Sequence, residues 1–244
     1  MASRKSILII NPNSTQSMTD GLKPLVDSLH FHNTTYTYFT APSGPPSINS
    51  ATDTTASAQH CLPSLLHLLP HHDGFLIACY SAHPLVALLQ AHETVRAGKK
   101  MVTGIFEASV ATSLQCLAPG ERFGIVSTGQ AWEAMLSEAV RDFLGAETSA
   151  RFAGVETTGL TAVELHDVGA EVVGERMREA VGRLVRRGEI GAVCLGCAGM
   201  AGMNEMVRGA LVGELGGEKG GRVKIVDGVQ AGVAWLEGAI RMEF

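Results

Sequence analysis

Short apolar runs rich in β-branched residues alternate along the chain with longer stretches of helical pattern. The apolar runs occupy residues 6–11, 35–41, 74–80, 100–106, 122–128, 152–158, 191–197 and 222–228. The helical stretches occupy residues 17–29, 83–98, 131–145, 173–188 and 230–242. Regular alternation of strand and helix is typical of an α/β fold built on a parallel sheet.

The stretch 83–98 illustrates the helical pattern, because apolar side chains such as Leu85 and Leu89 recur at helical spacing. Two segments interrupt the alternation with clusters of Pro and Gly, at 41–47 and at 213–222. The second segment lacks a phosphate-binding glycine motif, so we expect it to be a flexible connector.

The apolar runs fall into two sets that occur in the same order in each half of the chain. Residues 7–15 match 123–131, residues 73–82 match 190–200, and residues 101–109 match 224–232. This internal repeat predicts two pseudo-symmetric lobes, each a mostly parallel sheet flanked by helices, with the active site in the cleft between them. We expect residues 1–99 plus 207–244 to form the first lobe and residues 100–206 to form the second.

Composition and charge exclude several classes of function. Hydrophobic residues make up 45% and charged residues 18% of the chain, which is typical of a folded domain rather than a disordered one. A net charge of -5 disfavours nucleic acid as a partner, and we interpret the basic cluster of Arg183, Arg186 and Arg187 as a solvated helix face. No apolar run reaches the length of a membrane span, so we expect a cytoplasmic protein without a membrane partner. We expect its partner to be a small-molecule substrate.

The chain contains five cysteines, an odd number without a secretory context, so reduced thiols are expected. Cys79 and Cys197 end apolar strands and are followed by small residues, in the position where parallel sheets bind ligands. A thiol beside a helix N-terminus has a stabilised thiolate and is suited to proton abstraction next to a carbonyl group. Two such thiols, one on each face of a carbon atom, suffice for racemisation without a cofactor or metal.

The other cysteines and the histidines carry less chemistry. Cys61, Cys116 and Cys194 fit a structural, buried role. Cys194 and Cys197 have a C-x-x-C spacing, but further ligands for zinc are missing. The histidines of the segment 67–72 are interrupted by a proline and have no carboxylate cluster beside them, so we predict a solvent-facing loop there and no metal site.

Five motifs, in order along nearly the whole chain, resemble the Asp/Glu/hydantoin racemase superfamily. They are INPNST near the start, IACYSAHP around Cys79, GIFEAS in the middle, LGCAGMAGM around Cys197 and IVDGVQAGV near the end. The resemblance is greatest to the hydantoin and allantoin racemase branch. It implies two pseudo-symmetric α/β lobes, no cofactor, and Cys79 and Cys197 as the two acid/base thiols of a racemase.

The resemblance also implies polar groups that hold the substrate in the turns after two of the strands. Asn13 lies in the first of these turns, where its amide can bond to a ring carbonyl or N–H group. Ser127 and Thr128 occupy the equivalent turn of the second half. The alternative for all three is turn formation or helix capping.

The residues that follow the two cysteines differ from those of the amino-acid racemases in the superfamily. Tyr80-Ser81 and Ala198-Gly199 stand where those enzymes resemble Cys-Asn-Thr and Cys-Thr-His, which favours a neutral ring over an amino acid. Ser81 and the backbone N–H groups after each cysteine are candidates for binding a carbonyl oxygen. His83 is a further departure: it either tunes the thiol or contacts the ring substituent, or it is exposed at the rim of the site, which we slightly favour.

Three functions remain open at this point. The first is a cofactor-independent racemase of a 5-substituted hydantoin or allantoin. The second is a related isomerase or decarboxylase of a small carboxylic acid that uses the same cysteine pair, although few Arg or Lys residues flank the motifs. The third is a catalytically silent metabolite-binding protein. Related proteins form closed assemblies, so a homo-oligomer is one option for this chain, and the sequence determines neither the oligomeric state nor the ring substituent.

Overall fold

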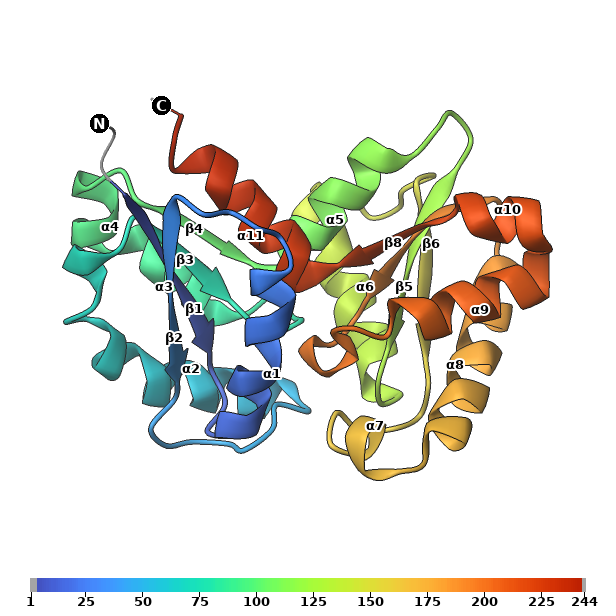
Figure 1. Cartoon of the computed structure of the whole chain (residues 1–244), viewed down its shortest axis with the longest axis horizontal. Helices are drawn as coiled ribbons and strands as arrows, with labels where there is room; N and C mark the ends of the chain where they lie inside the picture. The colour runs from blue at the N-terminus through green and yellow to red at the C-terminus, as the bar shows by residue number, and fades with distance from the viewer. Residues whose placement is uncertain (1–3, 243–244) are drawn as a thin grey trace. The chain divides into compact units, whose positions relative to one another are not determined.

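The computed structural model describes residues 4–242 and divides the chain into two compact units (Figure 1). The first unit contains the chain up to Ala108 and the segment from Val229 onwards, and the second unit contains Ser109–Gly228. All eight strands predicted from the apolar runs are present, four in each unit.

The first unit is a parallel four-stranded sheet with helices on both faces. Its strands are β1 (Lys5–Asn11), β2 (Thr34–Thr40), β3 (Gly74–Ile77) and β4 (Met101–Gly104), in the order β2-β1-β3-β4. Its helices are α1 (Gln16–Asp27), α2 (Ala51–Leu65), the 3-10 helix η1 (Leu69–His71), α3 (Pro84–Ala91), α4 (Glu93–Ala97) and α11 (Gly228–Ala239). Helix α5 (Ile105–Cys116) carries the chain out of this unit.

The second unit repeats the same arrangement. Its strands are β5 (Arg122–Ser127), β6 (Phe152–Thr157), β7 (Ile190–Leu195) and β8 (Lys224–Asp227), all parallel and in the order β6-β5-β7-β8. Its further helices are α6 (Ala131–Leu144), α7 (Glu164–Asp167), α8 (Ala170–Val185), η2 (Ala198–Met200), α9 (Asn204–Leu215) and α10 (Gly217–Arg222). The strand order confirms the predicted internal repeat, in which β3 and β7 are equivalent.

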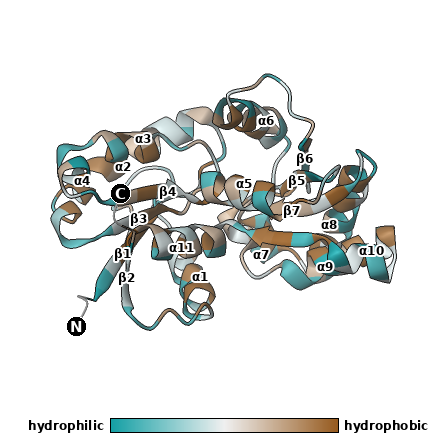
Figure 2. Ribbon diagram, turned by 90° about the horizontal axis from the view of Figure 1, so that it is seen from above, coloured by the Kyte–Doolittle hydropathy of each residue, from teal (hydrophilic) through white to brown (hydrophobic). Residues whose placement is uncertain are grey.

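The central strands of each sheet are buried on both faces, which explains their continuous apolar character. In the first unit, Phe75 and Ile77 pack on one face against α2 and α3. On the other face, Gly74 lies against Leu236 of α11 and against Ile240, the residue that follows this helix. In Figure 2 the apolar residues of the central strands, coloured brown, lie between helices that also carry hydrophilic residues.

The helix predictions are confirmed with local differences. The predicted helix 83–98 is divided at His92, which is extended and caps α4 through a bond from the Thr94 N–H group to its ring. Helices α2, α7 and α9 were not among the predicted helical stretches. In α2 the reason is a sequence that mixes polar and small residues and contains Pro63. The segment 213–222 is not a flexible connector but the end of α9 followed by α10.

The division between the units differs from the expected one. Residues 207–228 were expected in the first lobe but belong to the second unit, and residues 100–108 belong to the first. The reason is strand pairing: β8 pairs with β7, and β4 pairs with β3. The chain therefore returns to the first unit only at α11.

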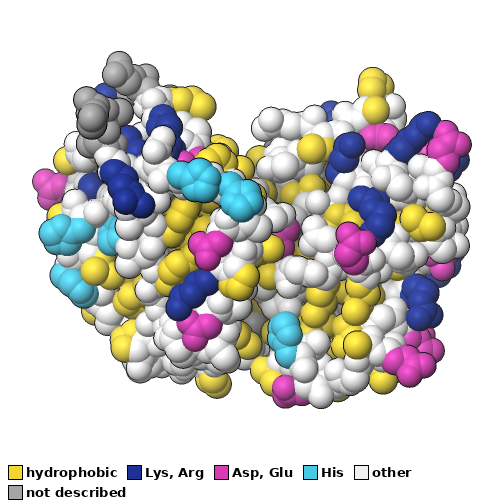
Figure 3. Space-filling model, viewed as in Figure 1, with side chains coloured by type: hydrophobic (Ala, Val, Ile, Leu, Met, Phe, Trp, Pro, Cys, Tyr) yellow, Lys and Arg dark blue, Asp and Glu magenta, His cyan; other side chains and the backbone are white. Residues whose placement is uncertain are grey.

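The basic cluster at the C-terminal end of α8, formed by Arg183, Arg186 and Arg187, is not a simple solvated face. Arg183 and Arg187 both form ion pairs with Glu156, whose side chain is only 6% exposed at the edge strand β6. On the face seen in Figure 3, acidic and basic side chains are interspersed. Within residues 4–242, no helix combines the length and the apolar character that crossing a membrane requires.

Candidate functional site

Cys79 lies two residues beyond the end of β3, before the N-terminus of α3. Its side chain packs against the apolar cluster between the sheet and helices α2 and α3, and it remains partly exposed. The sulfur lies 3.5 Å from Oγ of Ser81, which is itself buried. The thiol thus stands at the carboxyl end of a central parallel strand, where ligands bind in open α/β sheets.

The two residues after Cys79 serve the local structure of its turn. The Ser81 N–H group donates a hydrogen bond to the Cys79 carbonyl oxygen, at 3.0 Å. This donor is therefore not directed at a ligand, which corrects its expected role in binding a carbonyl oxygen. Tyr80 is buried and packs edge-on against the ring of Phe106, 5.7 Å between centroids, so its ring is part of the core.

His83 is buried, with only 2% of its surface exposed, so the favoured prediction of an exposed rim residue is wrong. Its Nδ1 atom accepts a bond from the Leu85 N–H group and caps α3, and its Nε2 atom lies 2.8 Å from Oγ of Ser57. Burial lowers the pKa of His83 to about 4. The ring is therefore neutral at physiological pH and does not act on the Cys79 thiol as a cation.

Cys197 occupies the equivalent position in the second unit, two residues beyond the end of β7. It is partly exposed and begins the 3-10 helix η2, and its sulfur accepts a hydrogen bond from the Gly199 N–H group at 3.3 Å. Burial raises the pKa of the Cys197 thiol, while the backbone N–H groups of Gly199 and Met200 lower it. The net effect is upward, so the resting form of Cys197 is the thiol.

Of the residues predicted in the β5 and η2 turns, Ser127 helps to position Cys197. Ser127 is fully buried and donates from its hydroxyl to the Gly196 carbonyl oxygen at 2.6 Å, so its side chain anchors the residue before Cys197. Gly196 approaches β5 so closely that a Cβ atom on it would lie 2.8 Å from the Ser127 Cβ. Thr128 is buried as well, and its carbonyl oxygen accepts from Gly159. Ala198 is partly exposed beside these residues.

Asn13 shapes the turn after β1. Its Oδ1 atom accepts from the Thr15 N–H group at 2.9 Å and from the Asn11 side chain at 3.0 Å. Asn11 itself is buried and also donates to Thr19, and the sequence analysis did not single it out. The oxygen of Asn13 is thus engaged within the turn, while its amide nitrogen lies 3.2 Å from the sulfur of Met18.

The remaining cysteines differ from one another in their surroundings. Cys61 is buried in α2, and burial raises its pKa to about 12. Cys194 is buried in β7 with its sulfur 3.0 Å from the Ser113 hydroxyl. Cys116 is exposed at the end of α5, so the expectation that it is buried is wrong.

Two residues near the thiols were missed by the sequence analysis. His166 of α7 is exposed, and its Nε2 atom and the Cys197 sulfur both lie 3.5 Å from the point that a Cβ on Gly199 would occupy. Glu107 lies at the start of α5, directly after β4, with a buried carboxylate oxygen. The only sequence signal for Glu107 is its place in the GIFEAS motif.

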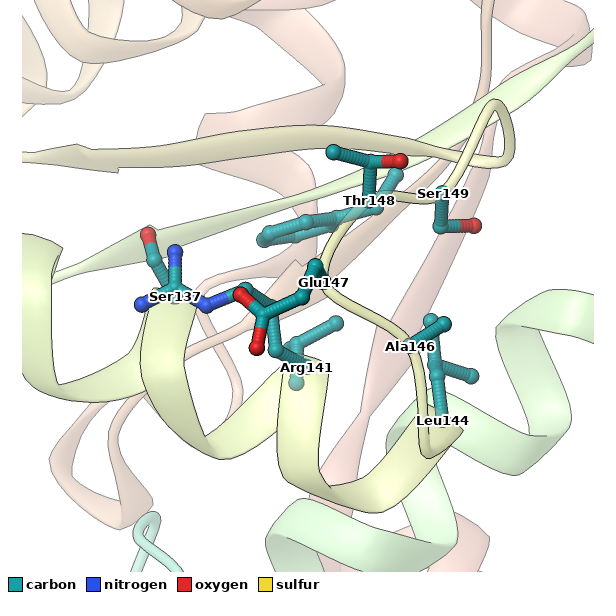
Figure 4. A pocket seen from close by; sticks show the side chains of 9 residues that line it. Ser137, Arg141, Leu144, Ala146, Glu147, Thr148 and Ser149 are labelled. Atoms are coloured by element: carbon teal, nitrogen blue, oxygen red, sulfur yellow. The ribbon is translucent and has the colours of Figure 1, made fainter.

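A pocket of about 210 Å³ in the second unit lies away from these strand ends. Its walls come from the C-terminal part of α6, the loop that follows and the first residue of β6, as Figure 4 shows. It therefore lies at the amino end of β6, opposite the end of the sheet that carries Cys197. Among residues 4–242, His, Cys, Asp and Glu side chains do not gather in any group of three or more suited to a metal ion.

The fold and the strand-end thiols together define a class of protein: duplicated parallel α/β units with one cysteine after the same strand of each unit. The family model described as Asp/Glu/Hydantoin racemase matches residues 7–236. The chain belongs to this family. This assignment confirms the predicted enzyme class, an isomerase of the racemase type.

Comparisons with individual proteins support the hydantoin and allantoin branch of the family. The chain is 35% identical to an uncharacterized protein of Schizosaccharomyces pombe, covering 97% of this chain and 92% of that protein. It is 30% identical to a hydantoin racemase of a Pseudomonas species, covering 95% and 84%. The solved structure of allantoin racemase from Klebsiella pneumoniae is 25% identical, with a TM-score of 0.78 over 97% of this chain and 87% of that one.

Proposed function

We propose that the protein racemises a hydantoin-type cyclic ureide, a 5-substituted hydantoin or allantoin, by proton transfer between Cys79 and Cys197. The observation that carries the proposal is the equivalence of the two cysteines. Each lies two residues beyond the third strand of its sheet order, and each keeps part of its surface exposed. The similarity to a hydantoin racemase over nearly the whole chain supports the choice of substrate.

The chemistry requires one acid/base group on each face of the stereocentre. In one direction, the Cys79 thiolate takes the proton from the ring carbon and the electron pair moves to the adjacent carbonyl oxygen. Cys197 then gives its thiol proton to the opposite face of the carbon and is left as a thiolate. The reverse direction exchanges the two roles, so no proton is gained or lost over the pair.

The environment of Cys197 suits the proton-donating role in the resting enzyme. Burial keeps the pKa of its thiol above the ordinary value, so the proton is present before the reaction. Once the proton has left, the Gly199 N–H group, already 3.3 Å from the sulfur, stabilises the thiolate. The same sulfur therefore functions in both protonation states.

The residues that follow the two cysteines in the chain suit a neutral ring better than an amino acid. Ser81 and His83 are buried and neutral, and Ala198 and Gly199 carry no side-chain charge. A free amino acid requires charged partners for its carboxylate and ammonium groups. A ureide presents only N–H donors and carbonyl acceptors.

The test is to incubate single enantiomers of allantoin and of 5-substituted hydantoins in deuterated water. We expect optical rotation to be lost together with exchange of the proton on the chiral carbon. Cys79→Ala and Cys197→Ala should each abolish racemisation, whereas Cys116→Ala, which removes an exposed cysteine, should not. Unchanged optical rotation for allantoin and for every 5-substituted hydantoin tested would overturn the proposal.

A further inference from the structure

Glu107 places a carboxyl group at the same end of the first sheet as Cys79. It follows β4, and β4 is the neighbour of β3 in the sheet, with Gly104 opposite Ile77 (Figure 1). The Cys79 side chain packs on the face of the sheet covered by α2 and α3. The Glu107 carboxylate lies over Gly104 on that same face, because a Cβ on Gly104 would meet both Oε2 of Glu107 and Val86 of α3.

One of the two oxygens of the Glu107 carboxylate, Oε2, has no hydrogen-bond partner among residues 4–242. Oε2 of Glu107 is fully buried and unsatisfied, and among residues 4–242 no ion pair involves this side chain. A buried acceptor without a partner costs about 1–3 kcal/mol, and more when the group is charged. Nearly all buried polar groups in native proteins have a partner, so an unsatisfied oxygen of this kind calls for an explanation such as a functional role.

Gly104 makes the space that this oxygen occupies. A Cβ atom on residue 104 would lie 2.2 Å from Oε2 of Glu107, which is closer than two non-bonded atoms can approach. The internal repeat provides a comparison, because Gln230 occupies the position after β8 that Glu107 occupies after β4. The fold therefore accommodates an amide at the equivalent site, so a carboxylate is not a requirement of the architecture.

We propose that Glu107 is a substrate-binding residue whose Oε2 atom accepts a hydrogen bond from a ring N–H group of the ureide. This inference rests on the proposed function, and it assigns one specific polar contact on the Cys79 side of the site. A ureide ring carries N–H groups next to its carbonyl groups. Such an N–H group is the hydrogen-bond donor that a neutral substrate can supply to an acceptor without a partner.

The ionisation of Glu107 agrees with this role. Burial raises the pKa of Glu107 to about 7, although the backbone N–H groups of Glu107 and Gly104 lower it. Gly104 and Val86, which lie against this carboxylate, carry no charge, and the ring of His83 at the start of α3 is neutral. A donor from the substrate adds to these two backbone groups in compensating the buried negative charge.

The first experiment measures binding and carbon-5 deuterium exchange for hydantoin, 1-methylhydantoin and 3-methylhydantoin. For the wild type, we expect methylation of one of the two nitrogens to weaken binding by about 10- to 100-fold, the loss of a hydrogen bond to a charged group. Glu107→Gln should weaken hydantoin binding by a similar factor and should lose the preference between hydantoin and that methylated analogue. Exchange at carbon 5 of bound substrate should persist, because the thiols are intact.

The outcomes separate the two proposals. If wild-type protein neither binds nor exchanges any hydantoin, the proposed function fails. If the wild type binds hydantoin and Glu107→Gln binds it equally well, the function stands and the role of Glu107 is overturned. Glu175→Gln, which makes the same change at an exposed position of α8, is the matched control and should leave binding unchanged.

A stability measurement distinguishes a binding role from a structural one. Because the folded-state pKa of Glu107 is raised from 4.5, stability is lost as pH rises toward about 7. Glu107→Gln removes this loss, so its melting temperature should exceed that of the wild type at pH 8 while its affinity for hydantoin is lower. A melting temperature below that of the wild type at pH 8 would indicate a structural carboxylate and would overturn the assignment.

Discussion

The neutral, buried imidazole of His83 makes the stability of the first unit depend on pH in a defined direction. Its pKa is lowered from 6.5 to about 4 by burial. The unfolded chain therefore takes up a proton near pH 6.5 that the folded protein does not, and stability is lost as pH falls through this range. Between pH 8 and pH 5 the loss attributable to this one ring is about 2 kcal/mol, since each pKa unit corresponds to about 1.4 kcal/mol.

The perturbation that isolates the effect is His83→Asn. The asparagine oxygen can still cap α3, but the side chain no longer titrates and no longer reaches Ser57. We expect the variant to be less stable than the wild type at pH 8. The difference in unfolding free energy should then shrink by about 2 kcal/mol on going to pH 5, because only the wild type carries the histidine penalty.

Urea unfolding at pH 8, 6.5 and 5, followed by circular dichroism, measures this difference directly. His92→Asn is the matched control, because His92 caps α4 in the same manner from a less buried position. The control reports the cost of replacing a capping histidine by asparagine. A difference in unfolding free energy between wild type and His83→Asn that is the same at all three pH values would refute the reasoning. That result would mean that the ring takes up a proton within the folded protein.

Three further predictions concern the second unit. Ser127→Ala should lower the free energy of unfolding by about 1–3 kcal/mol in urea, because it removes a buried 2.6 Å hydrogen bond to Gly196. It should also lower the racemisation rate, because Cys197 is displaced. Unchanged values of both quantities would contradict the anchoring role. Glu156→Gln should cost about 2 kcal/mol in the same assay, because two arginines lose a buried partner, whereas Glu179→Gln in an exposed pair should cost less than about 0.5 kcal/mol. Alkylation of Cys197 by iodoacetamide, quantified by mass spectrometry, should be slow at pH 7 and accelerate as the pH passes 9, because burial raises the pKa of its thiol; equal rates at pH 7 and pH 9 would show the reverse.

The sequence by itself determined the eight strands, five of the helical stretches, the repeat and the thiols. Central strands buried on both faces must be continuously apolar, and the edge strands are rich in β-branched and aromatic residues, so all eight were visible as runs. The order of motifs within each half identified β3 and β7 as equivalent. The positions of Cys79 and Cys197 followed directly, because a residue just after a central parallel strand lies at the ligand-binding end of the sheet.

Only the tertiary structure decided what the polar residues around the thiols do. Ser127 and His83 read as site residues in the sequence, yet one anchors Gly196 and the other caps a helix and contacts Ser57, because segments distant in the chain surround them. Glu107 was one acidic residue among many until its oxygen proved to be buried over Gly104 without a partner. Local pattern fixes which elements form, whereas burial and hydrogen bonding depend on contacts between elements that no local pattern records.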